Sequence, residues 1–159
     1  MEKLYAFYSY SFNLGNYLIG MKNIKLALKY FGLAYLIATI LGFSTYYIIN
    51  VIAMWVVMFT IMPIIFGYLF YRYLKNTGES NSNMFRETNI LIVFWIISSF
   101  LLDGFVYIAF VPIIYGYRPN WTFFIDQSPW IWLNYCTIII LGHISRYFYI
   151  RNVKNKYVP

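Results

Sequence analysis

Charged side chains are scarce in this sequence. Asp, Glu, Lys and Arg make up only 11% of its 159 residues, whereas hydrophobic residues make up 62%. A soluble domain normally carries about 25% charged residues. A water-facing surface cannot be built from so few charges, so we expect a lipid bilayer as the main partner. The net charge is +7, and the positively charged residues flank apolar segments. They are not gathered beside a nucleic-acid-binding motif, so we expect no nucleic-acid partner.

Metal-ligating and nucleophilic side chains are equally few. The sequence has one cysteine, Cys136, and one histidine, His143. A single cysteine excludes an internal disulfide and any multi-cysteine zinc or iron–sulfur site. The phosphate-binding, dinucleotide-binding, zinc-protease and nucleophile-elbow motifs are also missing. We therefore expect no metal, no cofactor and no catalytic residue of these classes.

The longest stretch without Asp, Glu, Lys, Arg or His runs from Tyr30 to Tyr71. It is about twice as long as the ~20 residues that one helix needs to cross a bilayer. Two helices joined by a tight turn fit it better than one, and we predict spans at residues 25–44 and 51–74. Pro63 falls inside the second span, where its missing N–H predicts a kink.

Two further apolar segments predict spans at residues 89–115 and 129–150. Polar residues without hydrophobic periodicity, at 75–88 and 116–128, predict the connections between spans. The predicted fold class is therefore an all-α integral membrane protein, a single membrane domain over residues 1–159 with a bundle of four transmembrane helices.

The segment before the first span, residues 1–24, mixes aromatic and polar side chains. This mixture predicts an amphipathic segment that lies in the membrane interface. A fifth span over residues 4–21 is the alternative, although Asn13, Gly15 and Asn16 interrupt it.

Positive charges predict the orientation. Of the twelve Lys and Arg residues, eleven fall beside the termini or the second connection, and only Arg118 falls on the opposite side of the four-span arrangement. Lys and Arg are enriched on the cytoplasmic side of membrane proteins. We therefore predict a multi-pass protein with both termini in the cytoplasm.

Asp103 is the one charged residue near the middle of the third predicted span. An ionisable group inside a membrane is costly and is a functional hypothesis by default. Ser99 and Tyr107, four residues to either side, share its helix face. This face is suited to bind a proton, a cation or a polar headgroup. The alternative is an anchor between helices, and either role predicts that Asp103 contacts a hydroxyl or amide on another helix.

His143 is the remaining candidate for proton handling, because its pKa in water lies near neutrality. In antiparallel helices it falls roughly 10 Å along the axis from Asp103, so we expect no direct Asp103–His143 pair. On the first span, Ala34, Ala38 and Gly42 recur every four residues. Small residues at this spacing favour close helix packing inside the bundle, with dimerisation as the second interpretation.

The third and fourth spans resemble small four-span bacterial membrane proteins that have no assigned activity. The resemblance is carried by Leu101-Leu102-Asp103, Pro119-Asn120, Trp130, Trp132, Tyr135 and Gly142. It implies a four-span architecture and assigns no functional residue.

Three classes of function remain open. The leading hypothesis is a non-enzymatic membrane protein that binds or passes a small polar or lipidic ligand through the bundle interior near Asp103. The second is a structural or accessory subunit that forms a homo-oligomer or docks a larger membrane partner. The third is an intramembrane enzyme that uses Asp103, Tyr107 and His143, and it is least favoured because no nucleophile and base can be placed in contact.

Overall fold

The structure, a computed structural model, describes residues 21–78 and 81–157. Helices contain 87% of these residues, and this part of the chain has no strand. The all-α prediction is therefore confirmed. The predicted interfacial segment 1–24 lies outside the described residues except for its last four, and so does the alternative span at 4–21 except for Met21.

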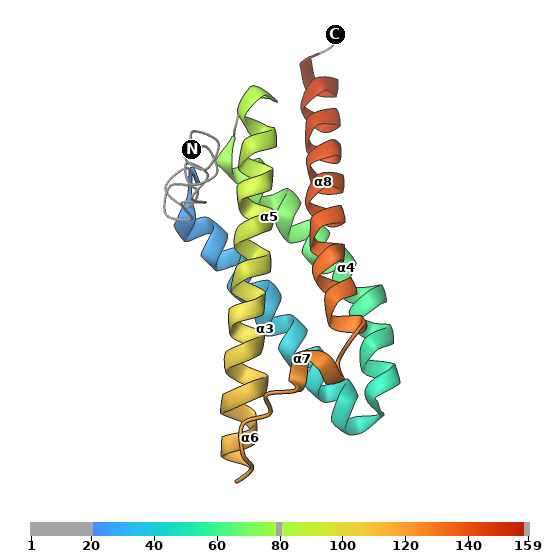
Figure 1. Ribbon diagram of the computed structural model, residues 1–159. Coiled ribbons are helices and arrows are strands. Elements are labelled where there is room, and N and C mark those ends of the chain that lie inside the picture. The colour runs from blue at the N-terminus through green and yellow to red at the C-terminus, as the bar shows by residue number, and fades with distance from the viewer. Residues whose placement is uncertain (1–20, 79–80, 158–159) are drawn as a thin grey trace, which may run out of the picture.

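Four long helices dominate the molecule (Figure 1). They are α3 (Ile24–Ile48), α4 (Val51–Thr77), α5 (Asn81–Asp103) and α8 (Trp130–Tyr157). A π-helical segment, Gly104–Phe110, carries α5 on into the short helix α6 (Val111–Ile114). Another short helix, α7 (Phe123–Asp126), precedes α8.

The turn between α3 and α4 is shorter than predicted. Helix α3 continues past residue 44 to Ile48, because its polar side chains find partners within the helix. The Thr45 hydroxyl, for example, donates to the carbonyl of Leu41 at 2.5 Å. The turn itself is fixed by Asn50, whose side chain accepts a hydrogen bond from the backbone N–H of Ala53 at 2.8 Å and caps α4.

The predicted loop at residues 75–88 is wrong for most of its length. Helix α4 ends at Thr77, where Gly78 adopts the left-handed conformation (φ 59°) that commonly terminates helices. Helix α5 then begins at Asn81 rather than at residue 89. The first turns of α5 consist mostly of polar residues, but Met84, Glu87 and Thr88 within them are buried. Packing of one helix face therefore outweighs the weak preference of these residues for a loop.

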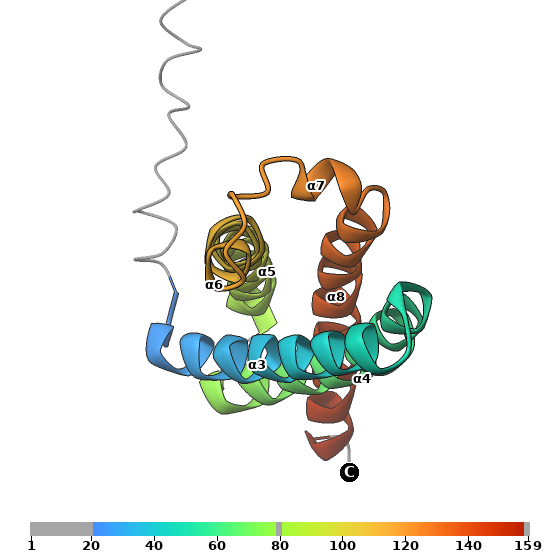
Figure 2. The same ribbon diagram turned by 90° about the horizontal axis from the view of Figure 1, so that it is seen from below.

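The helices pack in the order α3, α4, α8, α5, with closer contact along this series than between α3 and α5. Seen from below, α7 and its flanking segments run from α6 to α8 on the side of the bundle away from α3 (Figure 2). Helix α4 changes direction near its middle in Figure 1, where Pro63 lies, in agreement with the predicted kink.

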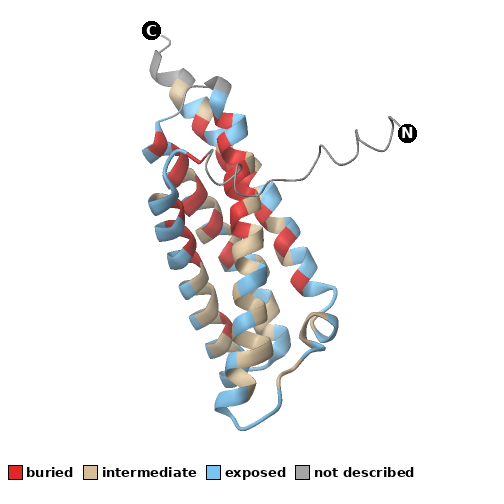
Figure 3. Cartoon of the chain, turned by 60° about the vertical axis from the view of Figure 1, so that its left-hand side comes forward, coloured by how far each residue is buried: buried red, intermediate tan, exposed pale blue. Residues whose placement is uncertain are grey.

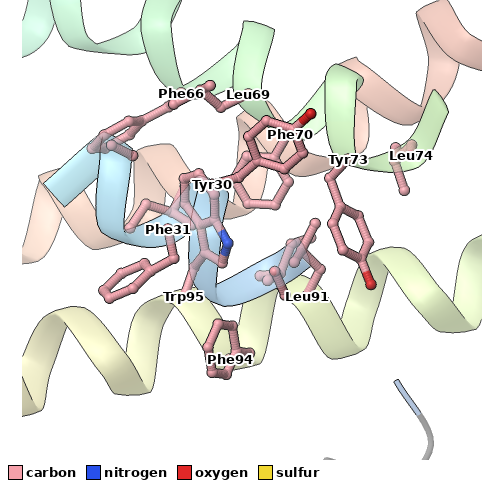
Figure 4. Close-up of a cluster of buried hydrophobic side chains, with 14 of the residues drawn as sticks. Tyr30, Phe31, Phe66, Leu69, Phe70, Tyr73, Leu74, Leu91, Phe94 and Trp95 are labelled. Carbon is pink, nitrogen blue, oxygen red and sulfur yellow. The ribbon is translucent and has the colours of Figure 1, made fainter. Parts of the chain in front are cut away.

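Buried side chains are concentrated at one end of the bundle, near the C-terminus (Figure 3). At their centre, Trp95 of α5 packs against Phe70 of α4 at 4.2 Å between ring centroids, with Phe31 and Phe66 beside it (Figure 4). Beyond Trp95 no residue of α5, the π segment or α6 is buried. The bundle is therefore tightly packed at this end and looser at the end that holds the α3–α4 turn.

Among the described residues, three helical stretches are long and apolar enough to cross a membrane: Ile24–Ile48, Val51–Thr77 and the continuous stretch Asn83–Ile114. They correspond to the first three predicted spans. Helix α8, with 28 residues, is longer than α3 and α4, but its apolar residues are interrupted by Asn134, His143 and Arg146.

Candidate functional site

Asp103 lies at the end of α5 and is held by two tyrosines from other helices. The hydroxyl of Tyr35, on α3, donates to Asp103 Oδ1 at 2.9 Å. The hydroxyl of Tyr135, on α8, donates to Oδ2 at 2.6 Å. The prediction that Asp103 contacts a hydroxyl on another helix is confirmed. Because each tyrosine binds one oxygen, the carboxyl group is fixed in position between α3 and α8.

Sequence reasoning missed both tyrosines, although helical periodicity contains a signal for each. On α8, Ile131, Tyr135 and Ile138 are buried and recur at the spacing of one helix face. On α3, Tyr35 follows the buried Phe31 by four residues and shares its face. Extending the apolar face of each helix to these positions would have predicted that both hydroxyls point toward the bundle interior.

A cavity of about 650 Å³ lies beside Asp103. Its walls come from α3, α4, α5, the π segment and α8, together with the segment between α6 and α8. Ser99 and Tyr107 line it along with Asp103, so the structure places these three predicted candidates together. Most of the wall is aromatic or aliphatic, and Asn120, Gln127 and Asn134 add neutral amides.

The small residues of α3 help to form this cavity. Ala38 and Gly42 line it, and a Cβ atom added at Gly42 would meet no atom within 4 Å. Ala34, one turn earlier, is buried in the packed core. The small residues of α3 therefore face the bundle interior, as the prediction of packing inside the bundle required. At Gly42, however, the missing side chain leaves open space and does not bring a second helix close.

A backbone hydrogen bond near Pro112 holds the segment after α6 across the cavity. The ring nitrogen of Pro112 has no hydrogen to donate to the carbonyl of Ile108, four residues earlier. The backbone N–H of Asn120 donates to that carbonyl instead, at 2.9 Å. This bond ties residues 115–122 to the π segment, which begins directly after Asp103. Such wide helical turns frequently accompany functional sites.

Stacked aromatic rings form one wall. Tyr107 stacks on Phe43 at 5.6 Å and on Phe123 at 5.0 Å between ring centroids. Phe43 in turn stacks on Tyr47 at 5.9 Å. These four rings come from α3, the π segment and α7, and all of them line the cavity. They connect three elements at the cavity wall.

His143 does not join the site. Its ring stacks on Phe85 in α5 at 6.2 Å. The preceding residue, Gly142, lies against Ile92, which is eleven residues or about 16 Å of helix from Asp103. The absence of a direct pair agrees with the sequence analysis, but the offset exceeds the predicted 10 Å. Cys136 is exposed on α8.

A second acid, Glu87, is buried at the opposite end of α5. It accepts hydrogen bonds from the Tyr73 hydroxyl and, at 3.3 Å, from the backbone N–H of Lys22. Sixteen residues, or about 24 Å of helix, separate it from Asp103. The packed rings around Trp95 lie between the two acids. Glu87 thus stabilises the closed end of the bundle and does not line the cavity.

Within residues 21–78 and 81–157, no three His, Cys, Asp or Glu side chains gather in a group that would hold a metal ion. Comparisons of the chain with family models, curated proteins and solved structures found no match. The similarity to small four-span bacterial membrane proteins therefore stays a prediction.

Proposed function

We propose that the chain is a four-span integral membrane protein that binds a small ligand in the cavity beside Asp103. Three helices already have the length and composition of spans. Helix α8 contributes the fourth, because it lies in the same bundle and turns apolar side chains outward. Leu133, Ile140 and Phe148 are 46–58% exposed. A continuous apolar exterior of this kind suits lipid better than water.

The observation that carries the ligand-binding proposal is a fixed carboxyl group in an already formed cavity. Most ligand sites are largely apolar cavities of about 300–1,000 Å³ with a few well-placed polar groups. The cavity beside Asp103 has this size and character. A purely structural anchor requires no adjoining space, whereas Gly42 and Ala38 keep space open next to it.

The two alternatives have less support. An accessory subunit would dock a partner through aromatic and small-residue faces, and of these the small residues Ala34, Ala38 and Gly42 face the interior. An enzyme that combines Asp103 with His143 would need the two side chains in contact, and they lie at different levels of the bundle. A ligand-binding or ligand-passing protein remains the best-supported function.

Filling the cavity tests the proposal. Gly42→Phe places a ring in the open space, and Gly32→Phe makes the same change on the same helix outside the cavity lining, where a Cβ also meets no atom. Each protein is purified in lipid nanodiscs, and released small molecules are identified by mass spectrometry. Wild type and Gly32→Phe should retain a molecule that Gly42→Phe lacks. Identical profiles from all three proteins would contradict the proposal.

A further inference from the structure

The charges around the cavity indicate which ligands it accepts. Asp103 is the one acid in its lining, and no Lys, Arg or His is found among the described residues that line it. An anionic ligand would meet the Asp103 carboxyl group, and no cation in the described lining would offset the repulsion. Fatty acids, phosphates and other anions are therefore poor candidates.

The two tyrosines hold the Asp103 carboxyl group in place and bring no charge of their own. In its ionised form a carboxyl group has about four acceptor positions on its two oxygens. Tyr35 and Tyr135 use one on each oxygen, and both donors are uncharged phenols. Asp103 therefore lines the cavity with acceptor positions left for further donors. The ionised form is stabilised best by a donor that also carries a positive charge.

An inorganic cation does not fit the surroundings. Sodium, calcium and magnesium are held by several converging oxygens. Here one carboxyl group stands beside a wall that consists mainly of rings such as Phe43, Phe66 and Tyr107. The cavity volume, about 650 Å³, is also far larger than one ion fills. The apolar wall calls for a ligand with an apolar body.

We infer that the ligand is an organic ammonium ion whose N–H groups donate to Asp103 and whose apolar body lies against the aromatic wall. This assignment rests on the proposed function, and it adds the sign of the ligand's charge and the orientation of the ligand in the cavity. The ammonium end lies against the Asp103 carboxyl group, next to Tyr35, and the body extends toward the stacked rings of Phe43, Tyr107 and Phe123. Ser99, one turn from Asp103 on the same face, lies within the lining for a second polar contact.

Three probes of one shape separate the possibilities: 4-phenylbutylamine, 4-phenylbutanol and 4-phenylbutanoate, which are cationic, neutral and anionic at neutral pH. Binding to the full-length protein in detergent is measured by titration calorimetry against empty micelles. The amine should bind wild type at least tenfold more tightly than the alcohol, and the anion should bind least. Asp103→Asn should remove the preference for the amine while leaving the affinity for the alcohol within about twofold.

Asp126→Asn is the matched control, because Asp126 is exposed on α7 and is not part of the cavity lining. It removes the same charge and should preserve the tenfold preference. Equal binding of amine and alcohol, both abolished by Gly42→Phe, would overturn the ammonium assignment and leave the ligand-binding function standing. Absence of saturable binding by any of the three probes would count against both.

Discussion

Asp103 is stabilised by groups that the helices deliver from opposite directions. The hydroxyls of Tyr35 and Tyr135 each satisfy one carboxylate oxygen, at 2.9 and 2.6 Å. A buried acceptor that loses its donor costs more than the bond itself contributed, because its desolvation is no longer offset. Each tyrosine hydroxyl therefore has a structural effect that is separable from any effect on a ligand.

Removing one hydroxyl should lower stability only while Asp103 is present. We predict that Tyr135→Phe destabilises the protein by about 1–3 kcal/mol and that the same change in an Asp103→Leu background, which has no acceptor for the hydroxyl, costs much less. Thermal unfolding in detergent measures both effects. Tyr147→Phe, at a residue that is 60% exposed, is the control and should change little. Additive effects of Tyr135→Phe and Asp103→Leu would show that the bond contributes no coupling.

At the scale of elements, two positions control how the helices meet. Gly142 on α8 lies where α5 comes closest: a Cβ built there would be 2.5 Å from Cγ1 of Ile92 and 3.5 Å from a ring atom of Phe70. Pro112 frees the carbonyl of Ile108, which Asn120 then binds. Gly142 allows α5 and α8 to lie close together at the tightly packed end of the bundle. Pro112 affects the position of the segment that crosses the cavity.

Gly142→Ala should destabilise the bundle by roughly 1–3 kcal/mol, because Ile92 or the helix backbone must move to admit the methyl group. Gly32→Ala is the matched control, since a Cβ there meets no atom within 4 Å. It should be neutral or stabilising by up to about 1 kcal/mol, because alanine favours helix. Melting temperatures in one detergent compare the two variants. A Gly142→Ala protein as stable as Gly32→Ala would contradict the close approach.

Pro112→Ala should loosen the segment after α6. The new N–H at residue 112 competes for the carbonyl of Ile108, so the Asn120 amide loses its acceptor for part of the time. We expect faster hydrogen exchange at that amide, as measured by mass spectrometry of peptides covering residues 115–122. Pro63→Ala changes a proline in another helix and should leave this exchange rate unchanged. Unaltered exchange in Pro112→Ala would mean that the proline does not control the segment.

At the scale of the whole molecule, the bundle is packed at one end and hollow at the other. Trp95 and its neighbouring rings seal the end that holds Glu87, whereas the cavity beside Asp103 lies toward the α3–α4 turn. In the orientation predicted from the positive charges, the hollow end would lie on the side of Arg118, away from the cytoplasm. A ligand would then reach Asp103 from the side of the membrane opposite the cytoplasm.

Cysteine labelling in intact cells tests this orientation and the fourth span together. On a Cys136→Ser background, a membrane-impermeant maleimide should modify a cysteine at Trp121, which is 79% exposed. It should not modify a cysteine at Asn83 or Asn155. Labelling at both Trp121 and Asn155 would contradict a membrane-spanning α8. Labelling at Asn83 with protection at Trp121 would instead invert the topology.

The sequence alone was sufficient for the helical fold class, for the three apolar helices and for the contact of Asp103 with hydroxyl groups of other helices. These features follow from local composition: hydropathy identifies an apolar helix, and an acid within one needs a polar partner. Only the tertiary structure showed that the partners of Asp103 are Tyr35 and Tyr135, that a cavity lies at Gly42 and that α5 begins as early as Asn81. Each of these depends on how packed helices rotate and cross, and close contacts such as Gly142 against Ile92 determine that geometry between segments far apart in the chain.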